Sequence, residues 1–229
     1  MSVDDSKQAL VLFSGGLDST TTLAYALSKN YKVVALTIDY KQRHCYEIEA
    51  SKKIISSHSN IEHIIFDIDL TKIGGSALTD QDIEVPVKSA DGIPITYVPA
   101  RNTIFLSIAA SYAEKYLISD IFIGVNAIDY SGYPDCRPEF INAYEKMINI
   151  GTKAGSEGQN FKIHTPLINL SKSEIISMGS DLNVNYRDTV SCYSLNNKGE
   201  ACGICDSCCF RRQGFIDAGI DDPTMYENK

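Results

Sequence analysis

Short apolar runs alternate with amphipathic segments along the chain as far as residue 178. Each run is apolar at successive positions, which is typical of strands buried on both faces of a parallel sheet. The segments between them carry apolar residues at helical spacing. The pattern predicts strands at residues 9–13, 31–38, 62–67, 120–125 and 161–167, and helices at residues 18–29, 47–57, 99–116, 138–148 and 171–178.

Polar residues and a proline mark where several of these helices begin. Asp18 or Ser19 is expected to cap the first helix, and Pro138 suits the first turn of a later one. Ser171 and Glu174 have the spacing of a capping box. The helix at residues 99–116 has little polar face and is therefore predicted to be deeply buried.

The alternation predicts an α/β fold with a doubly wound, mostly parallel five-stranded sheet. A length of 229 residues suits one such domain with a small appendage. The rhythm ends near Arg187, so we expect an α/β domain over residues 1–187 and a cysteine-rich segment, residues 188–229, packed on it. Residues 70–98 are expected to be a long ordered insertion, with one short helix at most, that could act as a lid.

The turn after the first strand has the sequence Ser14-Gly15-Gly16-Leu17-Asp18-Ser19. Paired glycines between a buried strand and a helix start let backbone N–H groups approach a ligand, and the helix N-terminus adds partial positive charge. The turn is therefore predicted to bind an anion, most often phosphate. It matches neither G-x-G-x-x-G nor the P-loop pattern, and an ordinary glycine-rich turn is the alternative.

The charge of the chain narrows the range of partners. A net charge of -8 argues against a tight grip on a nucleic-acid backbone, which needs clustered Lys and Arg. No apolar run has the length of a membrane span, and the first residues lack a signal pattern. We therefore expect a cytoplasmic protein with no membrane partner.

Four cysteines near the C-terminus have the spacing Cys192-x9-Cys202-x2-Cys205-x2-Cys208. Two-residue spacings let a tight turn direct two sulfurs at one centre, as in tetrahedral zinc sites. Four thiolates leave no open position for water, so one structural Zn²⁺ per chain is expected. An iron–sulfur cluster, a redox Cys-x-x-Cys pair and free thiols are alternatives, and spacing does not separate Cys208 from Cys209.

Polar residues gather after the predicted second and fourth strands, at the edge where open α/β sheets bind ligands. Residues 40–44 are polar and basic, and residues 126–137 form a loop rich in Tyr and Asp. His44 and His164 lie at strand ends and are candidates to face this cleft. Cys45 is expected to be buried or half-buried, whereas the role of Cys136 stays open.

The turn at residues 13–19 resembles the pyrophosphate loop of the ATP-pyrophosphatase superfamily. With the cysteine spacing and several further segments, it makes nearly the whole chain similar to the 7-cyano-7-deazaguanine synthase family. Lys41 departs from that family's pattern where Gly is usual, and Val190 departs where Trp is frequent. The further segments that carry the resemblance are residues 39–44, 98–102, 129–137 and 165–167.

The resemblance implies an adenine-nucleotide α-hydrolase-like fold and an ATP-dependent carbon–nitrogen ligase of queuosine biosynthesis, a tRNA modification pathway. Such an enzyme converts 7-carboxy-7-deazaguanine and ammonia to the 7-cyano base through adenylated intermediates, with Mg²⁺ accompanying ATP. It also implies a homodimer that uses free ammonia and does not bind nucleic acid directly.

The resemblance further implies roles for individual residues. The ATP-binding residues would be Phe13, Ser14, Gly15, Gly16, Leu17, Asp18, Ser19, Thr20, Thr21, Thr22 and Leu23. Candidates to bind phosphate or the substrate are Arg43, His44, Arg101, Asn102 and Lys172. Candidates to bind the deazaguanine by stacking and hydrogen bonds are Tyr130, Tyr133, Asp135 and Arg137.

Two other functions fit parts of the sequence. A tRNA-thiolating enzyme with the same loop would adenylate a base and deliver sulfur, but it needs an unligated cysteine pair and a basic face for RNA. A non-catalytic nucleotide-binding module, with a zinc segment that docks a partner, explains the loop and the cysteines. It leaves residues 126–137 without a purpose.

Overall fold

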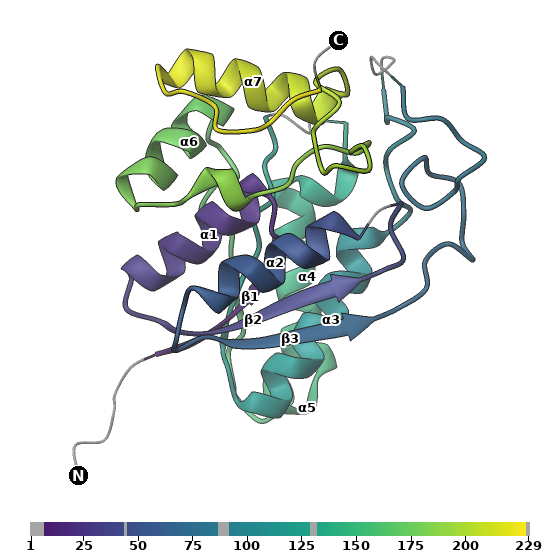
Figure 1. Ribbon diagram of the computed structural model, residues 1–229. Helices are drawn as coiled ribbons and strands as arrows, with labels where there is room; N and C mark the ends of the chain where they lie inside the picture. The colour runs from purple at the N-terminus through teal and green to yellow at the C-terminus, as the bar shows by residue number, and fades with distance from the viewer. Residues whose placement is uncertain (1–6, 44, 87–91, 129–131, 228–229) are drawn as a thin grey trace.

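The computed structural model describes residues 7–43, 45–86, 92–128 and 132–227 (Figure 1). Its five-stranded sheet has the order β3-β2-β1-β4-β5, and every neighbouring pair is parallel. The expected doubly wound α/β fold is thus confirmed. The strands are β1 (Gln8–Leu12), β2 (Lys32–Asp39), β3 (Glu62–Asp67), β4 (Asp120–Phe122) and β5 (Lys162–His164).

Helices cover both faces of this sheet. Two short 3₁₀ turns, Pro134–Cys136 and Tyr186–Asp188, lie in the connections. The helices are α1 (Leu17–Ser28), α2 (Tyr46–Ser56), α3 (Arg101–Tyr116), α4 (Pro138–Gly151), α5 (Lys153–Ser156), α6 (Lys172–Asp181) and α7 (Asp206–Ala218).

Alternate residues of the central strands pack into different helix layers. On β1, Ala9 and Val11 join the cluster with α1 and α2, whereas Leu10 and Leu12 join the cluster with α3 and α4. Because successive strand residues point to opposite faces, a strand covered on both sides is apolar at every position. This explains the apolar runs from which the strands were predicted.

Helices α6 and α7 extend the layer that contains α1 (Figure 1). Phe215 of α7 packs with Ile175 and Ile176 of α6, and the same cluster includes Leu17 at the start of α1. The cysteine-rich segment is thereby attached to the helix that follows the glycine-rich turn.

The helix starts confirm two predictions and correct one. The capping box of Ser171 is present, and Pro138 occupies the first turn of α4. The predicted cap of α1 is wrong, because α1 begins at Leu17 with Gly16 at its cap position and no side-chain cap. Asp18 and Ser19 lie inside the first turn instead, which leaves the helix start open to a ligand.

The insertion contains turns but no helix in its described parts, residues 70–86 and 92–98. One further expectation, that α3 is deeply buried, needs correction. Helix α3 is buried along one side only, since Ser107 and Ser111 are exposed while Leu106 and Ala109 are fully buried. Within the described chain, no helix combines the length and apolarity that crossing a bilayer requires.

Candidate active site

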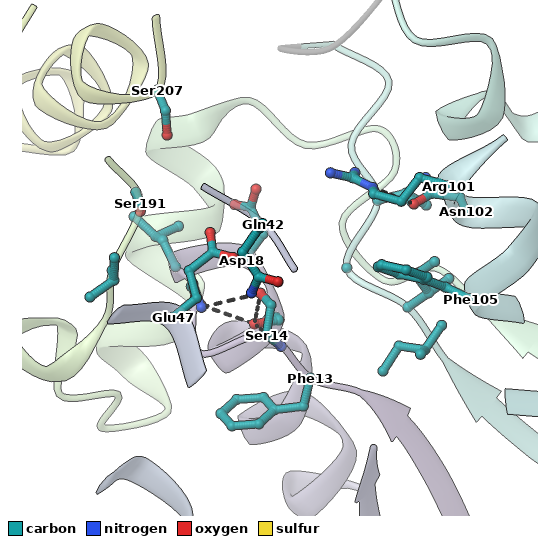
Figure 2. Close-up of a pocket in the computed structure, with 18 of the residues that line it drawn as sticks. Phe13, Ser14, Asp18, Gln42, Glu47, Arg101, Asn102, Phe105, Ser191 and Ser207 are labelled. Atoms are coloured by element: carbon teal, nitrogen blue, oxygen red, sulfur yellow. Dashed lines mark hydrogen bonds between the residues drawn. The ribbon is translucent and has the colours of Figure 1, made fainter. Parts of the chain in front are cut away.

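A cavity of about 230 Å³ lies at the carboxyl ends of β1, β2 and β4. The strand order reverses between β1 and β4, and open α/β sheets bind ligands at such a point. Two sides of the cavity face one another in Figure 2. One side carries Ser14, Asp18, Gln42 and Glu47, and the other carries Arg101, Asn102 and Phe105.

The β1–α1 turn, residues 13–19, depends on Gly15. Its φ is +82°, and a Cβ atom there would lie 2.6 Å from the Ser51 nitrogen and 2.8 Å from the Glu47 carbonyl oxygen of α2. No other residue fits without displacing that helix. The Gly15 carbonyl accepts a hydrogen bond from the Val190 N–H at 3.1 Å. The turn is thus held by α2 on one side and by the cysteine-rich segment on the other.

Two serines close the turn. The Ser14 N–H donates to Ser19 Oγ at 3.2 Å, and the Gly16 N–H donates to Ser14 Oγ at 3.3 Å. The Ser19 hydroxyl is also within 3.1 Å of the Gly16 carbonyl oxygen. These three residues line the cavity together with Phe13, Leu17 and Asp18.

The remaining members of the predicted ATP-binding set lie behind the turn. The hydroxyls of Thr20, Thr21 and Thr22 donate to backbone carbonyls one helical turn earlier. Leu23 belongs to the core. None of these four residues, nor Gly15, is among the described residues that line the cavity. They shape the helix start without facing the cavity.

Lys172 and Asp18 form a buried ion pair at the cavity. The Lys172 ammonium donates to both Asp18 oxygens, at 2.7 and 2.9 Å, and the two residues come from α6 and α1. The Lys172 side chain is only 9% exposed. Removing one partner would leave a buried, uncompensated charge. The structure therefore brings Lys172 to the turn, as the phosphate-binding hypothesis requires.

The N-terminus of α3 presents Arg101 to the cavity. This helix has no side-chain cap of its own, and Asp135 replaces one. The Asp135 carboxylate accepts from the Asn102 N–H at 3.0 Å, and the Asn102 amide donates back to the Asp135 carbonyl at 3.0 Å. Burial lowers the pKa of Arg101, but Tyr40 and other ionisable neighbours raise it, so the guanidinium stays charged.

Asp135, a candidate for the deazaguanine, is accordingly placed elsewhere. It is buried, and it is not among the described residues that line the cavity. Its carboxylate supports the helix start from which Arg101 projects.

Arg43 and Tyr133 line the cavity as predicted. The Tyr133 hydroxyl lies 2.7 Å from the Thr96 hydroxyl. Arg43 donates to the carbonyls of Ala77 and Ile83, at 3.1 and 2.8 Å. Arg43 therefore ties the insertion to the wall of the cavity in addition to facing it.

Other candidates are not brought to the cavity. Arg137 is exposed and is not among its described lining residues. The prediction that His164 faces the cleft is wrong, because its ring stacks on Phe122 at 4.4 Å and hydrogen-bonds to the start of β4. His44 and Tyr130 lie outside the described residues.

The two isolated cysteines differ in environment. Cys136 is buried and lines the cavity, and burial raises the pKa of its thiol to about 11. At neutral pH it is therefore a thiol and a poor nucleophile. Cys45 is exposed, contrary to expectation.

Glu47 lines the cavity but was not among the predicted site residues. It lies in the first turn of α2. Burial raises the pKa of its carboxyl to about 7, although Arg101 and Gln42 act to lower it. One signal could have found it: an acid placed directly after the polar segment 40–44, at the start of a helix.

The four predicted cysteines converge in one cluster, Cys192, Cys202, Cys205 and Cys208. Their Sγ atoms all lie within 4.8 Å of one another, and all four residues are buried. The sulfurs of Cys202 and Cys208 are 4.0 Å apart. Sulfurs around a tetrahedral zinc ion lie about 3.8 Å apart. The cluster therefore fits a metal ion of that kind.

Two details strengthen this assignment. Cys209 is exposed, so the structure selects Cys208 as the fourth ligand. The N–H groups of Ser194 and Cys202 donate to the Cys192 sulfur at 3.2 and 3.3 Å, as they would to a thiolate. Hydrogen bonding to Cys205 raises the pKa of the Cys192 thiol. A bound cation is what allows such crowded thiols to ionise together.

Arg211 of α7 links the cysteine cluster to the β1–α1 turn. Its side chain is 3% exposed and donates to Thr189 Oγ1 at 2.8 Å and to the Tyr186 carbonyl at 2.9 Å. These bonds fix the segment whose Val190 N–H donates to Gly15. The cluster therefore supports the turn through one buried side chain.

Comparison with known proteins identifies the family of this chain. The family model described as "Queuosine biosynthesis protein QueC" matches residues 8–219. The chain belongs to the QueC family. A 7-cyano-7-deazaguanine synthase of Cellvibrio japonicus is 57% identical over 220 residues, which cover 96% of this chain and 98% of that relative. One of Methylococcus capsulatus is also 57% identical, over 222 residues that cover 97% and 100%.

Among solved structures, an NMN synthetase from Francisella tularensis is similar in fold alone. It is 18% identical, with a TM-score of 0.51, and the alignment covers 95% of this chain and 79% of that one.

The structure accommodates Lys41 and Val190, the two residues expected from the resemblance to differ from the family's usual ones. Lys41 has a φ of +61°, a left-handed conformation that favours glycine. Its ammonium lies 3.2 Å from both Asp39 and Asp67, which offsets part of that strain. Val190 supports Gly15 through its backbone N–H, so this contact does not depend on the side chain.

Proposed function

We propose that this QueC chain makes 7-cyano-7-deazaguanine from 7-carboxy-7-deazaguanine, ammonia and ATP. The observation that carries the proposal is one cavity with the β1–α1 turn on one side and Arg101 on the other. The turn suits a polyphosphate, and Arg101 is a charged donor for a phosphate or a carboxylate. A relative named 7-cyano-7-deazaguanine synthase, 57% identical over nearly the whole chain, supports the choice of substrate.

The chemistry requires two activations. A carboxylate is a poor electrophile, so its oxygen first attacks the α-phosphorus of ATP and releases pyrophosphate. Ammonia then attacks the acyl adenylate, and AMP leaves to give the amide. The amide oxygen takes a second adenylyl group, again with release of pyrophosphate and a proton. Loss of AMP and the remaining N–H proton leaves the nitrile.

The residues on the cavity wall would act mainly by positioning and by charge. We assign Ser14, Gly16 and Ser19 to the pyrophosphate of ATP, through their N–H and hydroxyl groups. Arg101 and Lys172 would neutralise phosphate or carboxylate charge. Mg²⁺ bound with ATP would neutralise phosphate charge, and Asp18 is the carboxylate beside the turn that would hold it.

We further propose that the four-cysteine cluster holds one structural Zn²⁺, since four buried sulfurs leave no open coordination position. The ATP-binding domain would comprise residues 1–187, and the zinc-binding segment residues 188–229. Free ammonia as nitrogen donor, a homodimeric assembly, a cytoplasmic location and the absence of direct nucleic-acid binding belong to the same proposal.

The two alternative functions are less well supported. A thiolating enzyme needs a reactive cysteine pair at the nucleotide, and among the described residues only Cys136 lines the cavity. A non-catalytic module would not require the charged groups on both cavity walls. The QueC match over residues 8–219 favours the synthase over both.

The test is a direct assay. Purified, metal-loaded protein with ATP, Mg²⁺, 7-carboxy-7-deazaguanine and ¹⁵N-ammonium is expected to yield the ¹⁵N-labelled nitrile by mass spectrometry, together with AMP and pyrophosphate. Arg101→Met should lower kcat/KM by about 100-fold or more. The exposed Arg187→Met serves as the control. Absence of nitrile from the folded wild-type protein would overturn the proposal.

A further inference from the structure

The cavity contains a carboxylate that the proposed ATP chemistry does not use. Among the described residues that line it, the acids are Asp18 and Glu47. Both oxygens of Asp18 accept from Lys172, at 2.7 and 2.9 Å. Asp135, the acid expected to bind the base, instead accepts from the N-terminus of α3. Since Asp18 is assigned to Mg²⁺ and Asp135 to the start of α3, Glu47 is the acid left to contact the base.

The position of Glu47 is fixed by its surroundings. Its backbone carbonyl would be 2.8 Å from a Cβ on Gly15, so the first turn of α2 is packed directly on the β1–α1 turn. Its side chain lies on the cavity side opposite Arg101, beside Gln42 (Figure 2). The Gln42 carbonyl oxygen accepts from the Tyr40 N–H at 3.1 Å. A hydrogen bond from the Gln42 side chain acts to lower the pKa of the Glu47 carboxyl.

Resting on the proposed function, we propose that Glu47 recognises the pyrimidine edge of the deazaguanine. One carboxylate oxygen accepts the ring N–H, and the other accepts an N–H of the exocyclic amino group. The seven-carboxylate, at the far end of the base, would then point across the cavity towards Arg101.

The chemistry of the two ligands favours the base over ATP as the partner of Glu47. A guanine-type edge presents two adjacent donors, and a carboxylate presents two adjacent acceptors at matching spacing. Adenine offers an amino donor flanked by ring nitrogens that are acceptors, and these would repel one carboxylate oxygen. A carboxylate is therefore matched to the deazaguanine and mismatched to adenine.

In the protein without ligand, the environment of the Glu47 carboxylate also favours such a contact. Burial raises the pKa of the half-buried Glu47 carboxyl to about 7 although Gln42 hydrogen-bonds to it, so its anion is less well solvated than in water. Two N–H donors from the base would compensate for the lost solvation. The carboxylate thus contributes specificity, because a base without the amino group would leave one oxygen unpaired.

The experiment compares Glu47→Gln with wild type on two substrates: 7-carboxy-7-deazaguanine and its analogue without the 2-amino group. Glu49→Gln is the control, since Glu49 lies on the same helix, is exposed and pairs only with Lys52 in the described contacts. Melting temperature checks the fold. The expected results are a rise of about 100-fold in KM for the substrate, with kcat and KM for ATP changed by less than about threefold.

Substrate discrimination supplies the second readout. Wild type should prefer the amino-bearing base by about 30-fold or more, and Glu47→Gln should reduce that preference to less than about fivefold. A rise in KM for ATP instead, or an unchanged preference in the folded variant, would overturn the assignment of Glu47. If wild type itself made no nitrile, the proposed function would fail rather than this inference.

Discussion

The β1–α1 turn and the cysteine-rich segment meet at one hydrogen bond, from Val190 to Gly15. They are nevertheless held in shape by different forces. The turn follows a strand whose Ala9, Leu10 and Val11 are fully buried in the sheet core. The cysteine-rich segment instead depends on clustered thiols and on the polar contacts of Arg211.

The cavity therefore depends on two regions of the chain that are stabilised by different interactions. Burial of apolar strands stabilises the turn in proportion to area removed from water. The segment that carries the cysteines is too small to build a core of that kind and needs a cross-link or a metal. Disturbing either region should therefore affect ATP binding, but with different signatures.

The largest effect is expected from loss of the metal ligands. Cys208→Ser should lose the metal, unfold the cysteine-rich segment and abolish ATP binding, because structural zinc contributes roughly 10 kcal/mol or more in small sites. Elemental analysis should find one zinc per wild-type chain. The neighbouring Cys209→Ser, at an exposed residue, should match wild type in metal content and melting temperature. Equal behaviour of the two variants would contradict the ligand assignment.

Gly15→Ala tests the other region. The added Cβ would collide with the backbone of α2 at 2.6 Å in a left-handed conformation, and we expect kcat/KM to fall by about 1000-fold or more. Gly219→Ala is the matched control, with a φ of +67° but nothing within 4 Å of its Cβ. It should cost about 1 kcal/mol of stability and leave activity intact. Metal content should stay at the wild-type value in both variants.

Arg211→Met should separate support of the turn from metal binding. The variant loses the buried bonds to Thr189 and Tyr186, and we expect about 3 kcal/mol of destabilisation and a clear rise in KM for ATP. Arg212→Met, one residue further on α7, is the control, since it removes an exposed hydrogen bond to Gly203 and a contact with the Tyr226 ring but keeps the bonds of Arg211. If Arg211→Met kept its affinity for ATP, the proposed coupling between the regions would be refuted.

The smallest expected effect is on the pH dependence of stability, and it involves Glu47 beside the β1–α1 turn but not the cysteine-rich segment. The pKa of Glu47 is raised from 4.5 to about 7, so its neutral form stabilises the fold below pH 4.5 and this contribution disappears as pH rises through 7. Glu47→Gln should therefore gain about 2 kcal/mol over wild type at pH 8 and little at pH 4. Thermal melts across this range measure the difference. A constant difference would exclude titration of Glu47 as its source.

Local patterns were sufficient to predict most of the fold. The strands with two buried faces, the capping box at Ser171 and the proline at the start of α4 depend on residues close together in sequence. The cysteine cluster was predictable for the same reason, since metal-ligand spacings are short. The choice of Cys208 over Cys209 was not, because it depends on which face of α7 is buried.

Much of the cavity required the three-dimensional structure. Asp135 is an acid in the expected loop, but the N-terminus of α3 takes its carboxylate. His164 ends strand β5, yet it stacks on Phe122. Glu47 faces the cavity only because α2 packs on Gly15. Each outcome depends on contacts between segments far apart in the chain, which local spacing does not determine.

The hydrogen bond from Val190 to Gly15 has a consequence for physiology. If zinc folds the segment that supplies this amide, nucleotide affinity becomes a reporter of metal supply. Cells starved of zinc would lose synthase output while the sheet remained intact. Preparations of the same polypeptide would then differ in their dissociation constants for ATP according to the fraction of chains that contain zinc.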